Sequence, residues 1–258
     1  MYTRLLSLFI VLFFSSTACA VDVPPAETEF LCHFNGADAE TAASDVSLVT
    51  PNVLTFNGNA QLDTAQSVFG GSSLLLDGTG DYISMPDSDD WAFGTNNLTI
   101  SLRVRFNLIP GTTGIGFFTQ SVDASNRTNF YFNDVSNLLQ LLVADAGVNV
   151  LNITASWTPS TNTFYHVLMT RDGNSWRMFI DGTQIGSTVT DADGIPNRAT
   201  GVRLGQLMDS GGTFVGDLNG WIDEFLIING AALRVQNFTV ESREYGFPFG
   251  RSFFLFFD

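Results

Sequence analysis

The side chains that could do chemistry are few in this chain, and their spacing excludes most reactions. Glycoside hydrolysis needs two carboxylates that flank one bond, yet no Glu lies between Glu40 and Glu224. The adjacent pair Asp223 and Glu224 is expected to face opposite sides of a strand. Cys32 and His33 diverge for the same reason. The sequence therefore predicts no enzyme, although it leaves open a triad assembled from distant parts of the chain.

Aromatic and arginine side chains outside the longest apolar runs are the candidates for ligand binding. An aromatic ring can stack on a sugar while polar neighbours bind its hydroxyls. Trp157, beside a Thr-Pro-Ser turn, and Tyr131 are predicted to serve in this way. Arg103 and Arg105 alternate with apolar residues, so they are expected on the wet face of a strand, where they could meet an anionic sugar. Ordinary surface arginines are the competing interpretation.

These candidates must be positioned by strands, because short apolar runs alternate with Gly, Asn, Asp and Ser clusters. Apolar residues at every second position of segment 98–106 predict a strand with one buried face. Segments 164–171, 176–181 and 184–188 predict a meander, and 221–228 predicts one more strand. The chain has 258 residues, 45% of them hydrophobic. The pattern predicts one all-β domain, a two-sheet antiparallel jelly-roll sandwich.

The first twenty residues are expected to be a signal peptide rather than part of the fold. Arg4 precedes an apolar run, and Ala18-Cys19-Ala20 is typical of a cleavage site. We therefore expect a secreted or periplasmic protein with no transmembrane segment. A lipoprotein anchored through Cys19 is the alternative. The expected organisation is a signal peptide (1–20), a linker (21–29), the jelly-roll domain (30–240) and a Phe-rich C-terminal tail (241–258).

The formal net charge is −15 at pH 7. Nucleic-acid binding requires a basic face, so the charge argues against a nucleic-acid partner. It argues equally against binding to anionic lipid surfaces.

Several motifs in order resemble a known family. Segments 69–83, 98–106, 164–182 and 220–225 are similar to the strands and central hairpin of laminin G-like domains of the concanavalin A-like superfamily. The resemblance extends over about residues 30–239. It implies a curved two-sheet sandwich, often with one calcium ion, and often sugar or surface recognition. The same superfold hosts lectins, adhesins, hydrolases and spacers, so the resemblance is specific for fold alone.

The resemblance also implies where calcium would bind. In laminarinase-like relatives, the Asp of the closing strand meets the loop after the first strand to hold a structural ion. Asp223 has the matching place here, and Asp38 ends the matching loop 35–38. Backbone amides that satisfy Asp223 without metal are the competing interpretation. Those relatives hydrolyse glycans with two Glu on one strand, and this chain lacks that pair.

We therefore expect a secreted, non-catalytic module that binds a glycan or adheres, with an extracellular or cell-surface glycan or protein as its partner. The alternative is a structural or interaction domain of a cell-surface or virion assembly without a sugar site. A glycoside hydrolase is the third and least supported hypothesis.

Overall fold

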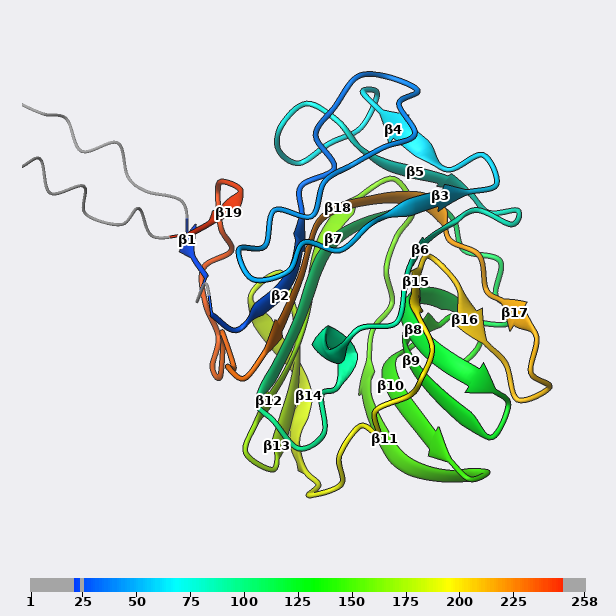
Figure 1. Ribbon diagram of the computed structural model, residues 1–258, viewed down its shortest axis with the longest axis vertical. Helices are drawn as coiled ribbons and strands as arrows, with labels where there is room; N and C mark the ends of the chain where they lie inside the picture. The colour runs from blue at the N-terminus through cyan, green and yellow to red at the C-terminus, as the bar shows by residue number, and fades with distance from the viewer. Residues whose placement is uncertain (1–20, 24–25, 248–258) are drawn as a thin grey trace, which may run out of the picture.

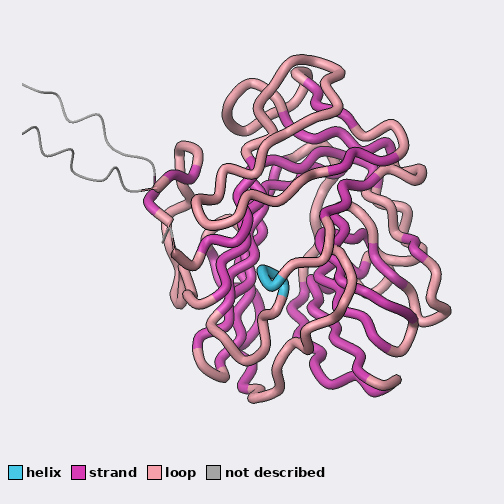
Figure 2. Tube along the Cα trace, viewed as in Figure 1, coloured by secondary structure: helices cyan, strands magenta, loops and turns pink. Residues whose placement is uncertain are grey.

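The computed structural model describes residues 21–23 and 26–247, which form two large antiparallel sheets packed face to face (Figure 1). Strands dominate the trace, and the one helical element among the described residues is a 3-10 turn, η1 (Asp89–Trp91) (Figure 2). None of the described helical structure is long and apolar enough to cross a membrane. The predicted all-β jelly-roll sandwich is confirmed.

The first sheet has seven strands. In spatial order they are β11 (Val148–Ser156), β10 (Leu138–Asp145), β9 (Asn126–Asn133), β8 (Ile115–Asp123), β15 (Val202–Leu204), β6 (Tyr82–Met85) and β3 (Thr55–Asn57).

The second sheet has eight strands. Seven follow one path: β14 (Thr183–Thr190), β13 (Ser175–Ile180), β12 (Phe164–Asp172), β7 (Leu98–Leu108), β18 (Asn219–Asn229), β5 (Ser73–Asp77) and β4 (Gln61–Asp63). The eighth, β2 (Thr28–Cys32), also pairs with β18. The expected strand over 98–106, the meander over 164–188 and the closing strand are therefore all present. Asp181 and Gly182 both have positive φ, as a two-residue hairpin turn requires.

Phenylalanine side chains join the two sheets. The ring of Phe106 on β7 packs 6.2 Å from Phe117 on β8 and 5.8 Å from Phe132 on β9, measured between centroids. Cys32 lies in the same core as a buried free thiol. Burial of such large rings removes much apolar surface from water, which is the main stabilisation available to the part of the chain that the structure describes, where no disulfide forms.

A second apolar cluster lies on the other side of the eight-stranded sheet. Residues 231–247, here called the cover segment, pack there against Leu31 on β2 and against Leu226 and Ile228 on β18. The cover segment contains β19 (Tyr245–Gly246), which pairs in parallel with β1 (Val21–Asp22), outside β2 in Figure 1. The eight-stranded sheet is therefore buried on both faces around β2, the second half of β18 and the neighbouring parts of β7 and β12.

This packing changes the predicted domain boundaries. Residues 21–29, expected to be a linker, contribute β1 and the start of β2. Residues 241–247, assigned to the tail, belong to the cover segment, where Glu241 and Tyr245 are buried. The predicted signal peptide, including Cys19, and residues 248–258 of the predicted tail lie outside the described residues.

Candidate functional site

Trp157 is part of the core, so the prediction that it is an exposed binding aromatic is wrong. Only 7% of its surface is exposed. Its ring packs 5.1 Å from Phe132, 5.7 Å from Phe106 and 5.4 Å from Tyr165. The Trp157 amide donates to the carbonyl of Asn137, which holds the loop against the sheet. Three neighbouring rings offer more buried area than a polar loop position, and local sequence does not show them.

The predicted wet face of β7 is also largely buried. Arg103 is 6% exposed because the cover segment lies over it, and its Nη2 donates to the carbonyl of Glu241 at 3.1 Å. Arg105 is half-buried, stacks 4.7 Å over the ring of Trp221 and donates to Asn162. The two arginines therefore anchor the cover and a surface tryptophan. Trp221 lies on this outer side and is half-buried, whereas Trp91 and Trp176 are buried in the core.

Asp223 and Glu224 lie where β18 changes its neighbour. The first half of β18 pairs with β5 and the second half with β2. A bulge after Asp223 absorbs the change, with Glu224 at φ 52°. A bulge shifts the alternation of faces by one residue. Asp223 therefore lies opposite Arg103, whereas unbroken alternation along β18 would place it on the core face with Phe225 and Ile227.

The two predicted calcium ligands each have a partner. Asp223 Oδ2 accepts from the amides of Val68 at 2.7 Å and Phe69 at 3.2 Å, while its Oδ1 is buried without a partner. Burial raises the pKa of Asp223 to about 7, against the effect of those amides. Asp38 Oδ1 accepts from the amide and hydroxyl of Thr64.

Ser72 links the loop that contains Asp38 to the segment whose amides bind Asp223. The Gly36 amide donates to Ser72 Oγ at 2.8 Å, and Ser72 Oγ donates to the carbonyl of Phe34 at 2.9 Å. The loop after the first long strand thus lies against the segment whose amides bind Asp223. Both parts of the chain therefore belong to the same region of the fold.

The outer face of the seven-stranded sheet, turned away from the core, has a different character. Tyr131 lies opposite Gln140, and Asn129 lies opposite Thr119. The Tyr131 hydroxyl donates to Gln140 Oε1 at 2.8 Å, and Gln140 Nε2 donates to Asn152 at 2.7 Å. Hydroxyl and amide groups therefore form a polar ladder across β9, β10 and β11.

A short hairpin, β16 (Leu207–Met208) with β17 (Phe214–Val215), lies on this face next to β8 and β9 (Figure 1). The side chain of Asn129 exchanges two hydrogen bonds with the backbone of Met208. Gly116 permits the close approach, because a Cβ there would lie 2.1 Å from the Gln206 carbonyl carbon. The hairpin covers the middle of the face and leaves a pocket on each side.

The first outer-face pocket has a volume of about 370 Å³. Arg203 lies in its wall, with its guanidinium 4.3 Å from the ring centroid of Tyr82 and 3.5 Å from that of Phe214. The guanidinium donates to Gln206 Oε1 and makes no ion pair with a described carboxylate. The remaining lining includes the hydroxyl side chains of Ser84, Thr119 and Ser121.

The second outer-face pocket has a volume of about 230 Å³ and lies on the other side of the hairpin. Arg127, Asn129, Tyr131 and Asp209 line it together with apolar groups. Tyr131 is only 8% exposed, but it does border this pocket. Burial raises the pKa of Tyr131, which keeps its hydroxyl protonated. Of the predicted binding residues, Tyr131 alone lies here.

Sequence reasoning missed Arg203, Phe214 and Asn129. In segment 126–133, residues 127, 129 and 131 alternate with Thr128, Phe130 and Phe132, so this alternation could have placed Asn129 beside Tyr131. Arg203 and Phe214 gave no such signal, because the irregular segment between β15 and β18 brings them together.

One constellation has the order of a catalytic triad but is closed. Ser101 Oγ is 2.7 Å from His166 Nε2, and His166 Nδ1 is 3.7 Å from Glu241 Oε2. The Tyr245 hydroxyl lies 3.2 Å from both Ser101 Oγ and His166 Nε2, where an acyl group would have to enter. All four residues are buried, Ser101 and His166 on the sheet and Glu241 and Tyr245 in the cover segment above them. Desolvation lowers the pKa of His166 well below its ordinary value. This geometry suits a buried structural network.

Comparisons with solved structures agree with this architecture. Domain 4 of AbnA, a GH43 extracellular arabinanase from Geobacillus stearothermophilus, was solved with arabinotriose. It matches with a TM-score of 0.59 and 17% identity, over 79% of this chain and 93% of that one. The binding domain of Paraclostridial Mosquitocidal Protein 1 matches with a TM-score of 0.59 and 16% identity, over 81% of this chain and 50% of that one. The botulinum neurotoxin serotype G binding domain matches with a TM-score of 0.58 and 12% identity, over 78% of this chain and 47% of that one.

The chain therefore spans about half the length of those two toxin domains. At these identities the likeness concerns the fold. No curated protein sequence matches the chain. The family model described as the concanavalin A-like lectin/glucanases superfamily matches residues 77–236, well over half of the sequence. With its two-sheet jelly roll, the chain belongs to the concanavalin A-like lectin/glucanase superfamily.

Proposed function

We propose that this chain is a secreted, non-catalytic glycan-binding module whose ligand lies on the outer face of the seven-stranded sheet. The observation that carries the proposal is the first outer-face pocket. There Arg203 is held between two aromatic rings beside three hydroxyl side chains. Aromatic faces contact the apolar side of a sugar ring, and hydroxyl, amide and guanidinium groups bind its oxygens.

The second outer-face pocket extends this surface. Tyr131 and Arg127 offer an aromatic ring and a guanidinium on the far side of the hairpin. An extended oligosaccharide that passes the hairpin could contact both pockets. The arabinanase domain solved with arabinotriose, which has a similar fold, supports the assignment of a glycan as the ligand class.

The number of carboxylates in the two outer-face pockets also favours binding over catalysis. Asp209 is the one carboxylate among the residues that line the two outer-face pockets. Both common glycosidase mechanisms require a second carboxylate across the scissile bond. We therefore expect binding without hydrolysis, and no turnover of β-glucans.

A glycan array tests the proposal on the exported protein. We expect selective binding that falls at least about tenfold for Arg203→Gln, because such a substitution removes a charged donor worth over 1.4 kcal/mol. Arg177→Gln, on β13 of the other sheet, makes the same charge change as a matched control. If the array shows no ligand, or if both variants bind alike, the structural or interaction domain without a sugar site becomes the better hypothesis.

We also propose a structural calcium ion at Asp223. The residues fit in part: Asp223 Oδ1 is a buried oxygen without a partner, and Asp38 keeps one carboxylate oxygen without a hydrogen bond among the described residues. Calcium takes several such oxygens. When bound, the ion would supply the positive charge that a buried carboxylate needs.

A further inference from the structure

Three side chains from distant parts of the sequence meet at one edge of the eight-stranded sheet. His33 follows the end of β2, Glu224 lies in the bulge of β18, and Glu244 belongs to the cover segment. One ligand atom from each, a ring nitrogen and two carboxylate oxygens, lies within 4.8 Å of the others. The group is separate from the outer-face pockets, which lie on the other sheet.

Each of the three side chains is held in place. His33 Nδ1 is 2.6 Å from Glu224 Oε1, and the amide of Tyr245 donates to Glu224 Oε2 at 3.0 Å. Asn35 Nδ2 donates to Glu244 Oε1 at 2.7 Å. Hydrogen bonds that orient the ligands from outside are a regular property of protein metal sites. A site with preset side chains also loses little conformational entropy when the ion binds.

The charges around this group do not balance. Glu224 is 1% exposed and Glu244 is half-buried. Against these two carboxylates stands one imidazole, which is neutral or carries one charge. Arg103, opposite Asp223, already donates to Glu241 in the cover segment. Buried carboxylates require a cation or a paired donor, so the imbalance favours a positive ligand.

We propose that His33, Glu224 and Glu244 bind one divalent transition-metal ion of the zinc type. A mixed set of one imidazole and two carboxylates suits zinc, whereas calcium prefers oxygen ligands throughout. The ion takes the place of the proton shared by His33 Nδ1 and Glu224 Oε1. It thereby joins β2, the β18 bulge and the cover segment, three parts of the fold that are otherwise linked by hydrogen bonds and by apolar packing.

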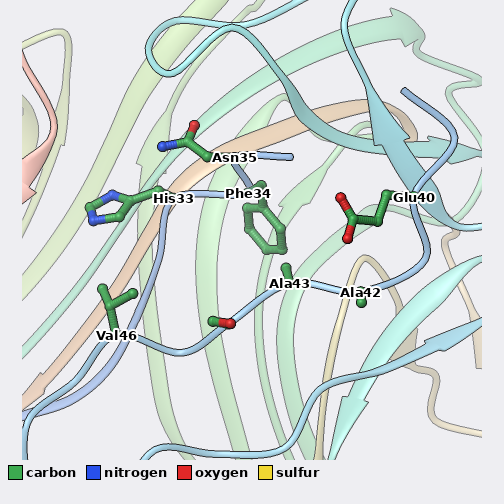
Figure 3. Close-up of a pocket in the computed structure, with 8 residues that line it drawn as sticks. His33, Phe34, Asn35, Glu40, Ala42, Ala43 and Val46 are labelled. Carbon is green, nitrogen blue, oxygen red and sulfur yellow. The ribbon is translucent and has the colours of Figure 1, made fainter. Parts of the chain in front are cut away.

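Solvent reaches this group from two sides. His33 and Asn35 line a pocket of about 320 Å³, whose other wall is formed by residues 40–46 (Figure 3). Glu244 and Tyr245 line a second cavity with Phe69 and Gly70. In Figure 3, Phe34 lies between His33 and Glu40, and Glu40 Oε2 accepts from the amide of Ala37, so Glu40 is a nearby acid outside the proposed ligand set.

The test uses the whole exported protein stripped of metal, with Zn²⁺ alone as the probe. We expect one ion bound per chain by titration calorimetry and a melting temperature that rises with Zn²⁺ concentration, because an ion bound only to the folded state stabilises by mass action. Glu244→Gln should weaken binding by more than about tenfold, the least expected from a damaged metal site. Glu244 is half-buried, so this variant keeps the fold.

Glu40→Gln is the matched control and should bind Zn²⁺ as the parent does. Co²⁺ gives a second measurement, since its visible spectrum reports nitrogen and oxygen ligands and should change in His33→Asn. Binding that is absent at micromolar Zn²⁺, or that Glu244→Gln and His33→Asn leave unchanged, overturns the proposal. Zn²⁺ binding that Asp223→Asn removes and Glu244→Gln does not would place the ion at Asp223 and would equally overturn it.

Discussion

The outer faces of the two sheets carry similar polar residues, but one face is buried and the other is partly open to solvent. On β7, Thr99, Ser101 and Arg103 lie beneath the cover segment and are buried. On the seven-stranded sheet, a short hairpin covers only the centre of the face, and the side chains beside it reach two pockets. The strand pattern is the same in both cases. Whether an outer face becomes buried or stays open as a binding surface therefore depends on the segment that packs over it.

The covered face has a cost that the open face avoids. Arg103, Arg234 and His166 converge on Glu241, with Arg234 Nη2 2.8 Å from Glu241 Oε1. Several atoms of this network are buried without a hydrogen-bond partner, including Glu241 Oε2 and His166 Nδ1. Buried polar networks depend on each member, because a group that loses its partner keeps its desolvation penalty.

The largest effect is expected where the covered face loses its central acid. Glu241→Gln should destabilise the fold by about 3–5 kcal/mol, since it leaves two arginines without their counter-charge beneath the cover segment. Urea unfolding would measure the change. Asp87→Asn, an exposed acid, serves as the control and should change stability by less than about 0.5 kcal/mol. Equal effects of both substitutions would show that the network adds nothing to the attachment of the cover.

The second prediction concerns Asp223, which lies on the covered face opposite Arg103. Chelation should lower the melting temperature, and Ca²⁺ should restore the part of it that depends on Asp223, with about 2.7 kcal/mol gained at a hundredfold excess over Kd. Asp223→Asn should remove this response. Identical melting curves with chelator and with millimolar Ca²⁺ would show that backbone amides alone satisfy Asp223.

Without metal, the stability that Asp223 contributes should fall as the pH rises. Burial raises the pKa of Asp223 from 3.8 to about 7, so the folded state favours the protonated form. The stability that this contributes is complete below about pH 4 and is lost as the pH rises through 7. Calcium should therefore stabilise most above pH 7, where the carboxylate is ionised, and melting curves across pH 5–9 would reveal this.

Strand positions were predictable because apolar alternation is a local property. The strand over 98–106 and the meander over 164–188 follow from it directly. Long-range contacts were not predictable: three rings bury Trp157, and the cover segment buries Arg103. The bulge at Glu224 arises where the pairing partner of β18 changes from β5 to β2. The spacing of residues within one strand does not show which strands will pair with it. The candidate site was found only at Tyr131, for the same reason.

The smallest effect on stability is expected on the open face, at Gly116. A Cβ there would lie 2.1 Å from the carbonyl carbon of Gln206, so Gly116→Ala should displace the β16–β17 hairpin from β8. Overpacking of this kind costs about 1–3 kcal/mol. The displaced hairpin would carry Phe214 away from Arg203, so glycan binding should fall much more than stability does. Gly211→Ala is the matched control, because its nearest contact is the side chain of Asp209 at 3.2 Å, which can move. Binding measured beside the melting temperature separates the two effects. If Gly116→Ala binds glycan as the Gly211 variant does, the hairpin is a cover like the C-terminal one, and it plays no part in shaping the pockets.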